Sequence, residues 1–354
     1  MRDSRQVAHH RSTIGQVATA AGVSKTTVSH VLNKTRPVSE GATQRVLDAV
    51  EQLNYWPSAA ARSLRTKKSG VVGVIISDAR NQFFGELLRG IEWGFGRAGY
   101  AMLVCNTDEQ LQRERLYLEL LMRQHVDGII VGAASRDWPV LNTARSYHLP
   151  MVFVDRRFDQ IAGPVVGVDN EGGAYLGTRH LIDDGYREIG LIAGFSRLST
   201  IRERTAGFTR ALRESGLQAP KSWVAASPLS VEGGRSAARR VLSMKRHPRA
   251  LFINNNLLTL GTLLALKDLG LRCPRDVAIV AFDDHAWAPV SDPPITVVDQ
   301  PVHRLGQMAA KALSDLMEGR DVDDNNLTLP CSLILRESCA SHDAASHDAG
   351  AGIS

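Results

Sequence analysis

Four side chains near the start of the chain could form hydrogen bonds to the edges of DNA bases. Lys25, Thr26, Ser29 and His30 lie in the segment SKTTVSHVLN, residues 24–33, on faces that its apolar residues do not use. Lysine and histidine can donate to guanine N7 and O6, and threonine can contact a base or its methyl group. A helix with such residues in its first turns can enter the major groove. We therefore predict that this segment reads DNA sequence.

Polar and basic residues around this segment are suited to holding DNA phosphates. Contacts of this kind set the register of a protein on the duplex without reading its sequence. The residues predicted to make them are Thr13, Ser24, Asn33, Lys34 and Arg36. On spacing and charge alone, a small helical domain that binds another protein is the alternative.

The distribution of charge favours a polyanionic partner for this region. The first 70 residues contain eleven Lys and Arg against four Asp and Glu, a net charge of +7. The remaining residues contain 31 basic against 33 acidic side chains, a net charge of −2. A basic head on a nearly neutral body indicates that the head meets nucleic acid and the body meets something else.

Three short helices are needed to position the side chains of the head. Apolar residues at three- and four-residue spacing predict a helix from about residue 14, a second over 25–33 and a third that ends near Asn54. Ser24 and Ser39 are placed to cap the second and third helices. We predict a disordered N-terminus over residues 1–12, an all-α helix-turn-helix domain over 13–56, and a hinge helix with linker over 57–70.

The body shows an α/β pattern. Apolar runs alternate with amphipathic segments, at residues 71–77, 101–106, 128–132, 151–155, 189–194, 250–255 and 277–282. Uniformly apolar strands separated by helices predict parallel sheets covered on both faces, here as two doubly wound lobes. The predicted ranges are 71–340 for the body, with an N-lobe of about 71–168 plus 300–328 and a C-lobe of about 169–299 plus 329–340, and 341–354 for a disordered tail. A ligand is expected in the cleft, beyond the carboxyl ends of the strands.

The composition argues against a membrane or exported protein. The apolar runs are far shorter than the ~18 to 20 residues of a membrane span. Residues 1–12 lack the apolar core of a secretory signal, and the four cysteines are scattered as reduced thiols would be. We therefore expect a cytoplasmic protein without membrane contact.

The sequence gives no support for a catalytic motif, a cofactor site or a metal site. The G-x-G-x-x-G match at residues 94–99 closes a helix and precedes a strand, which reverses the context of a dinucleotide site. Cys331, Cys339, His342 and His347 have spacing that fits no standard zinc site. A G-x-S-x-G nucleophile motif is missing from the sequence. We expect no enzymatic activity, no cofactor and no metal.

A series of motifs resembles the lactose-repressor family of transcriptional regulators. The first are TIGQVATAAGVSKTTVSHVLN, LNYWPS and ARSL, and the later ones are HVDGII, VDNEGG, RERTAGF, VAFDD and PPITVVDQP. The resemblance covers about residues 13–340, and the head is most similar to the purine-repressor branch. It implies a body similar to periplasmic sugar-binding proteins, and as partners a double-stranded DNA operator, a small-molecule effector and a second copy of the chain.

The resemblance also assigns a role to the hinge. It implies that residues 57–65 form a helix when they lie in the minor groove. The residues placed there are Ala61, Leu64 and Arg65, and Leu64 matches the side chain that the family wedges between base pairs. Ordering of this helix in the minor groove would bend the operator.

For the cleft, the resemblance implies a set of effector-binding residues. These are Phe83, Phe84, Asp169, Arg204, Asn256, Asp283 and Trp287. Carboxylates can accept hydrogen bonds from vicinal hydroxyls, a guanidinium can donate to oxygens, and an aromatic face can stack on a ring. A helix cap or a structural ion pair is the alternative role for Asp169 and Arg204, and hinge packing is the alternative for Trp287.

Two features of the resemblance bear on the effector. Leu198 and Leu229 stand where purine repressors have an Arg and a Phe, which argues against a purine. A shift of one residue in the comparison would instead place Arg197 at the first of these positions. Trp287 resembles the corresponding residue of members that bind sugars and sugar acids. The expected effector is therefore a sugar or sugar acid.

Together these features predict a ligand-responsive transcriptional regulator, a repressor that binds a palindromic operator as a dimer. Ligand binding would shift the populations of lobe arrangements and so change the separation of the two hinges. The alternative is an exported two-lobed solute-binding protein without DNA function, which would have no use for residues 13–65.

Overall fold

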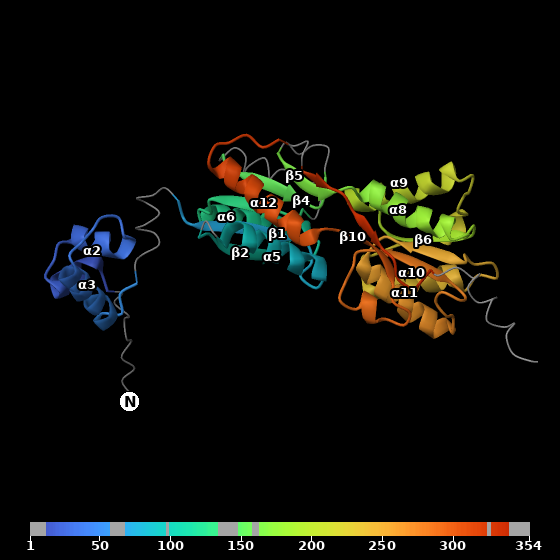
Figure 1. Cartoon of the computed structure of the whole chain (residues 1–354), viewed down its shortest axis with the longest axis horizontal. Coiled ribbons are helices and arrows are strands. Elements are labelled where there is room, and N and C mark those ends of the chain that lie inside the picture. The colour runs from blue at the N-terminus through green and yellow to red at the C-terminus, as the bar shows by residue number, and fades with distance from the viewer. Residues whose placement is uncertain are drawn as a thin grey trace, which may run out of the picture. The chain divides into compact units, whose positions relative to one another are not determined.

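The computed structural model describes residues 12–56, 68–96, 99–133, 148–157, 163–323 and 327–339. The chain forms two compact units that divide between Ser69 and Gly70. The first is all α-helical and the second is α/β, which confirms the predicted fold class (Figure 1). The expected disordered ends, 1–12 and 341–354, lie almost entirely outside the described residues, as does the hinge with Ala61, Leu64 and Arg65.

The first unit, the head, consists of three helices around one small core. These are α1 (Ile14–Ala21), α2 (Lys25–Asn33) and α3 (Glu40–Gln52). Val17, Val28 and Val46, one from each helix, are fully buried against one another. The apolar spacing read from the sequence therefore corresponds to the faces that meet in this core.

Local hydrogen bonds set where the head helices begin. Thr13 caps α1 in a capping box, in which its own backbone N–H donates to the Gln16 side chain at 2.8 Å. Ser24 accepts from the Thr27 backbone N–H at 3.0 Å, as predicted. Ser39 occupies the N-cap position of α3, but its side chain makes no capping hydrogen bond, so that part of the prediction is wrong.

Six strands form the sheet of the N-lobe, in the order β11-β5-β4-β3-β1-β2 with all neighbours parallel. They are β1 (Val71–Ile76), β2 (Ala101–Asn106), β3 (Gly128–Val131), β4 (Met151–Val154), β5 (Val165–Val168) and β11 (Thr328–Leu329). The helices of this lobe are α5 (Gln82–Gly96), α6 (Leu111–Arg123) and α12 (Val302–Met317).

The sheet of the C-lobe has the order β12-β10-β9-β8-β6-β7, in which only the β10–β12 pair is antiparallel. Its strands are β6 (Ile189–Gly194), β7 (Val224–Ser227), β8 (Ala250–Ile253), β9 (Ala278–Phe282), β10 (Thr296–Asp299) and β12 (Ser332–Ile334). Its helices are α8 (Asn170–Asp183), α9 (Ser199–Glu214), α10 (Val231–Leu242) and α11 (Asn256–Leu269), with short 3-10 turns η1 (Lys221–Trp223) and η2 (Ala288–Val290).

The predicted apolar runs match β1 to β4, β6, β8 and β9, but the sequence reading missed the other five strands. β5, β7 and β10 are four residues each, β11 is two and β12 is three. Only every second residue of β7 is buried, because this strand lies at the edge of its sheet. Runs this short do not stand out from the surrounding sequence.

Alternate residues of each strand are buried under different helices, so both faces of each sheet are covered. In β1, Val74 and Ile76 share a core with α5 and α12, whereas Ile75 packs with α6. In β6, Leu191 packs under α8 and α9, whereas Ile192 belongs to the core under α10 and α11. The continuous apolar runs of the sequence follow from this two-sided burial.

Glycines let α12 lie unusually close to α5 in the N-lobe. A Cβ added at Gly90 would lie 2.1 Å from the His303 carbonyl oxygen, and one at Gly306 would lie 2.3 Å from the Leu87 carbonyl oxygen. Only glycine permits this approach, since the neighbouring atoms are backbone. The contact returns residues 302–317 to the lobe in which residues 71–168 fold.

Across the described part of the chain, no helix has the length and apolar character needed to cross a bilayer.

Candidate functional site

The predicted base-reading residues lie on the surface of the head. Lys25 and Thr26 are exposed in the first turn of α2, and Ser29 and His30 are half-buried one turn later. Val28 of the same helix is fully buried. Helix α2 is therefore held by its apolar side and presents its polar side to solvent.

Lys25 lies against the start of α1. A Cβ added at Gly15 would lie 3.3 Å from Lys25 Cε and 3.7 Å from both Lys25 Nζ and Thr13 Oγ1. The ammonium group is thus close to the N-terminal turn of α1 while its residue opens α2. Since helix N-termini carry partial positive charge, these features make one electropositive surface.

His30 is held in one orientation by a neighbour. Its Nδ1 lies 2.8 Å from Thr35 Oγ1, which leaves Nε2 as the ring nitrogen for an external partner. Asn33 donates from Nδ2 to the Ser29 carbonyl oxygen at 2.7 Å, so part of its amide already serves the helix.

The remaining predicted phosphate contacts divide into caps and exposed cations. Thr13 and Ser24 use their hydroxyl oxygens as helix caps. Lys34 ends α2 in a left-handed conformation with φ of 51°, and both it and Arg36 are exposed. Neither forms an ion pair with a described residue, so both cations are available to a polyanion.

A polar cavity of about 60 Å³ lies in the body, between residues of the N-lobe and residues of the C-lobe. Its lining consists of Asp78, Asn81, Phe83, Phe84, Glu109, Asp155, Arg156, Thr200, Ile201, Arg204, Leu229, Asn255, Leu257, Asp283 and Gln300.

Four of the seven predicted effector residues line this cavity. Phe83 and Phe84 lie in the first turn of α5 with their rings edge to face, 5.1 Å between centroids. Arg204 comes from α9, and Asp283 follows β9. The structure therefore brings together residues that are up to 200 positions apart.

Arg204 is a buried hub of the C-lobe as well as a part of the cavity wall. Its Nε donates to Asn170 Oδ1 at 2.8 Å and its Nη1 to the Asn254 carbonyl oxygen at 2.7 Å. The guanidinium also lies 3.6 Å from the centre of the Phe282 ring and 3.8 Å from Asp283 Oδ1. Most of its hydrogen-bonding capacity is used by the protein.

Asp283 is held in a left-handed conformation, with φ of 80°. Its Oδ2 accepts from the Asn256 backbone N–H at 3.2 Å, and its Oδ1 accepts from the Gln300 side chain. These bonds fix the carboxylate in the cavity wall. An aspartate is well suited to the position because a short polar side chain tolerates this backbone conformation better than most.

The other three predicted effector residues do not line the cavity. Asp169 is exposed and caps α8, accepting from the Gly172 N–H at 2.8 Å, which is the alternative role considered for it. Asn256 is outside the lining, and its Nδ2 donates to Asn81 Oδ1 at 2.8 Å in the other lobe. Its neighbour Asn255 takes the lining position.

Trp287 is also outside the cavity lining. Its ring stacks on the ring of His285, with centroids 6.4 Å apart, and it packs on the core under α10 and α11. The packing role, rather than ligand stacking, is the one that the structure displays. Arg197, which a one-residue shift would have placed in the pocket, is exposed.

The sequence reading missed several polar residues of the cavity, and they share a position in the fold. Asp78 follows β1, Asp155 and Arg156 follow β4, and Gln300 follows β10. Glu109 lies just beyond the end of β2. A polar residue directly after an apolar run was the available signal, because carboxyl ends of parallel strands converge on one edge.

Each charged side chain of the cavity lies near an opposite charge, but within the described part of the chain the Asp155 carboxylate makes only an ion-pair contact. Arg156 donates to both Glu109 carboxylate oxygens, at 2.8 and 2.6 Å. Burial raises the pKa of Asp155 to about 6, against the opposing effect of Arg156, whose Nε lies 3.5 Å from Asp155 Oδ2. Asp155 forms no hydrogen bond through its carboxylate to any residue that the structure describes.

Two further buried polar atoms lack hydrogen-bond partners among the described residues. These are Gln300 Oε1 and Arg156 Nε, and both residues line the cavity. Buried polar atoms are normally paired, so unpaired ones in a cavity wall indicate positions where a ligand or water binds.

Comparison with known proteins gives matches over both units. Residues 13–58 match the family described as bacterial regulatory proteins, lacI family, and residues 178–339 match the periplasmic binding protein-like domain. The chain is similar to the HTH-type transcriptional repressor PurR of Photobacterium profundum, with 36% identity over 328 residues, 92% of this chain and 98% of that protein.

Solved structures show the same architecture. The lac repressor dimer bound to operator and the anti-inducer ONPF has a TM-score of 0.84 at 27% identity, covering 94% of this chain and 100% of that one. The complex of the transcriptional regulator CelR with cellobiose has a TM-score of 0.71 at 29% identity, covering 93% and 100%. The similarity therefore extends over head and body together.

Proposed function

This chain belongs to the lacI family of bacterial regulatory proteins, and on that premise we propose that it is a dimeric repressor whose head reads a palindromic operator and whose cavity binds a neutral sugar. Members of the family are DNA-binding transcriptional regulators and not enzymes. The alternative of an exported solute-binding protein does not account for a head that matches this family over residues 13–58.

In the proposed complex, α2 enters the major groove. Lys25, Thr26, Ser29 and His30 contact base edges, because none of the four is buried in the core of the head. Thr13, Ser24, Asn33, Lys34 and Arg36 contact the phosphates. The hinge residues Ala61, Leu64 and Arg65 would occupy the minor groove between the two half-sites. Such a protein would act in the cytoplasm, where bacterial DNA lies.

A palindromic operator has two equivalent half-sites, so it requires two heads and hence a dimer. The N-lobe has a surface suited to the dimer interface. Strand β2 is at the edge of its sheet, and its Leu103 and Val104 are 42% and 47% exposed. On α6, which packs on this edge, Leu116 and Leu120 are 59% and 43% exposed. Exposed apolar side chains on neighbouring elements mark a protein interface. Sedimentation analysis should give a dimer, and Val104→Lys should shift it toward monomer.

The hydrogen-bond acceptors that line the cavity are the main support for a sugar as the effector. Asp155, Asp283 and Gln300 present oxygen acceptors from the ends of three strands, and Gln300 Oε1 is buried without a donor among the described residues. Hydroxyl groups of a sugar can donate to all three. The lining contains four carboxylates and two guanidinium groups, both already paired, so a neutral sugar fits this charge balance better than a sugar acid.

A purine is the competing effector. Several relatives of the chain carry the name of the repressor PurR, which favours it. Against it, Leu229 lines the cavity where purine repressors have a Phe, and the lining contains four carboxylates, to which sugar hydroxyl groups can donate. The two effectors are therefore distinguished by a direct binding test.

A thermal-shift screen with neutral sugars, sugar acids and purine bases provides that test. A sugar at 100 times its dissociation constant should stabilise the protein by about 2.7 kcal/mol and raise the unfolding temperature of the body. Stabilisation by a purine base, with no response to any sugar, would overturn the effector assignment.

The DNA proposal is tested by selection from random duplex DNA, followed by gel shift. The selected sites should form an inverted repeat, and binding to them should weaken steeply as salt rises. Retention of random and selected DNA with equal affinity would overturn the base-reading role of α2.

A further inference from the structure

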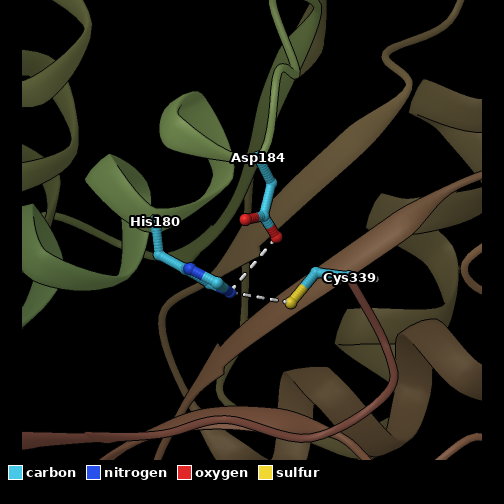
Figure 2. A group of neighbouring side chains, drawn as sticks. All are labelled: His180, Asp184 and Cys339. Carbon is cyan, nitrogen blue, oxygen red and sulfur yellow. Dashed lines mark hydrogen bonds and ion pairs between the residues drawn. The ribbon is translucent and has the colours of Figure 1, made fainter. Parts of the chain in front are cut away.

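A cluster of three side chains with metal-binding chemistry lies in the C-lobe. It consists of His180, Asp184 and Cys339, and their candidate ligand atoms all lie within 4.8 Å of one another. His180 Nε2 is 3.1 Å from Cys339 Sγ and 3.4 Å from Asp184 Oδ2. Figure 2 shows the three side chains pointing toward a common centre. None of the three lines the cavity.

We propose that His180, Asp184 and Cys339 bind one zinc-like divalent metal ion, with a water molecule as the fourth ligand. Imidazole nitrogen, thiolate sulfur and carboxylate oxygen are the ligands that zinc uses. With ordinary zinc–ligand lengths, a tetrahedral site separates its ligand atoms by roughly 3.4 to 3.6 Å. The two separations given above are within a few tenths of an ångström of that range, and the third, between Cys339 Sγ and the Asp184 carboxylate, is no more than 4.8 Å. Side-chain adjustments of about an ångström or less would bring all three ligand atoms into that range.

The fold holds the cluster in place from two sides. His180 and Asp184 are four residues apart at the C-terminal end of α8, where Asp184 is the C-cap. A helix C-terminus carries partial negative charge, which favours a cation there. Cys339 is 1% exposed and is also anchored by a contact of its Sγ with Thr296 Oγ1 at 3.1 Å. The ligand set is therefore assembled before any metal binds.

The surroundings of the cluster combine a buried wall with an accessible side. The side chains of His180 and Asp184 are 19% and 25% exposed, which gives an ion a route to the site. Tyr186 belongs to the same core as Cys339, and its buried hydroxyl has no hydrogen-bond partner among the residues described.

Metal binding would join parts of the chain that are 159 residues apart. The Cys339 S–H bond breaks, a sulfur–metal bond forms, and one proton leaves to the buffer, with no change in oxidation state. The metal would then hold the end of the chain's last described segment against α8. We expect the zinc-bound C-lobe to unfold at a higher temperature than the metal-free one.

The test uses untagged full-length protein, stripped with a chelator, kept reduced, and titrated with Co²⁺. One equivalent should bind with a thiolate-to-cobalt charge-transfer band, and Zn²⁺ should displace it. Cys339→Ser should abolish the band. His180→Gln and Asp184→Asn should each weaken Co²⁺ binding by at least about tenfold.

Two control variants separate this cluster from other ligands. Cys105→Ser removes a thiol from β2 in the N-lobe, and the paired change His342→Gln with His347→Gln removes the tail histidines. Both should retain the band and the affinity. Loss of binding in the tail variant together with full binding in His180→Gln would overturn the proposal, as would a missing charge-transfer band.

Folding is checked by the unfolding temperature of each variant without metal. If Cys339→Ser does not fold, His180→Gln and Asp184→Asn decide the question, since both side chains are partly exposed. Unchanged Co²⁺ affinity in these two variants would refute the site. Operator binding without metal is measured in parallel, and it should equal that of the parent, so failure of this site and failure of the repressor function are distinguishable.

Discussion

The head and the ligand cavity use their cations in opposite ways. Lys34 and Arg36 of the head are exposed and form no ion pair within the described parts of the chain. Arg156 and Arg204 of the cavity are buried, and each donates hydrogen bonds to the protein. The head therefore presents its charges to a partner, whereas the cavity has already paired most of its own.

This difference predicts how substitutions in the two regions act. A surface cation of the head can be removed with little effect on folding, because no partner is left buried. Removal of a buried cation of the cavity should destabilise the protein, because the oxygen atoms that it pairs with would stay buried without a partner. Binding and stability should be separable in the head and coupled in the cavity.

The largest effect is expected from Arg204→Met. The substitution leaves Asp283 and the Asn254 carbonyl oxygen without their buried partner, which should lower the free energy of unfolding by about 3 to 5 kcal/mol. Arg202→Met on the same helix is the matched control, because among the described residues Arg202 donates two exposed hydrogen bonds of 3.3 Å, and its loss should cost under about 1 kcal/mol. Urea unfolding measures both, and equal losses would contradict the comparison.

A pH-dependent effect of up to about 2 to 3 kcal/mol is expected from Asp155. Burial raises its pKa to about 6 in the folded protein, so the folded state holds the proton more tightly than the unfolded chain. Stability from this group is complete below about pH 4 and is lost as pH rises through 6.

The matched variant for this prediction is Asp155→Asn, since asparagine tolerates the left-handed φ of 71°. The unfolding free energy of the parent should fall relative to the variant between about pH 4 and 6, and the difference should then stay constant. A difference that is flat over this range would show that Asp155 titrates normally.

In the head, Lys25→Ala and His30→Ala should each cost about 1 to 3 kcal/mol in operator binding and relax preference at one base position. Arg36→Ala should weaken binding to all sequences alike and lower the salt slope by about 1. Gel shifts on the selected site and its single-base variants distinguish the two patterns. None of the three changes should alter the unfolding free energy by more than about 0.5 kcal/mol.

The smallest effect is expected from the helix caps of the head. Ser24→Ala removes a 3.0 Å hydrogen bond to the Thr27 N–H and should destabilise α2 by about 1 kcal/mol. Ser39→Ala removes no capping hydrogen bond and should cost only a few tenths. Amide hydrogen exchange of α2 and α3 measures the two, and an equal loss in both helices would show that the Ser39 side chain caps α3 in solution.

Much of the head could be predicted from the residues because its structure depends on near neighbours. Helix periodicity, the Ser24 cap and the exposed side of α2 all involve residues within about four positions of one another. The same holds for the α/β pattern of the body, since each strand and helix buries its own local stripe of apolar residues. These features can therefore be predicted from the amino-acid sequence.

The composition of the cavity could not be read in this way. Asp169 and Asp155 both follow short apolar strands, yet the first caps α8 and the second lines the cavity. Asn255 and Asn256 are adjacent, and only the packing of α11 decides which of them faces a ligand. Choices of this kind depend on which distant segment packs beside a residue.

Residue order thus decided where helices and strands begin and which side of each is apolar, because those preferences act over a few residues. Tertiary packing decided that Asp283 meets Gln300, that Arg204 is a buried hub, and that Cys339 reaches His180. The physical reason is that hydrogen bonds and ion pairs act over about 3 Å, while the residues that make them can be more than a hundred positions apart.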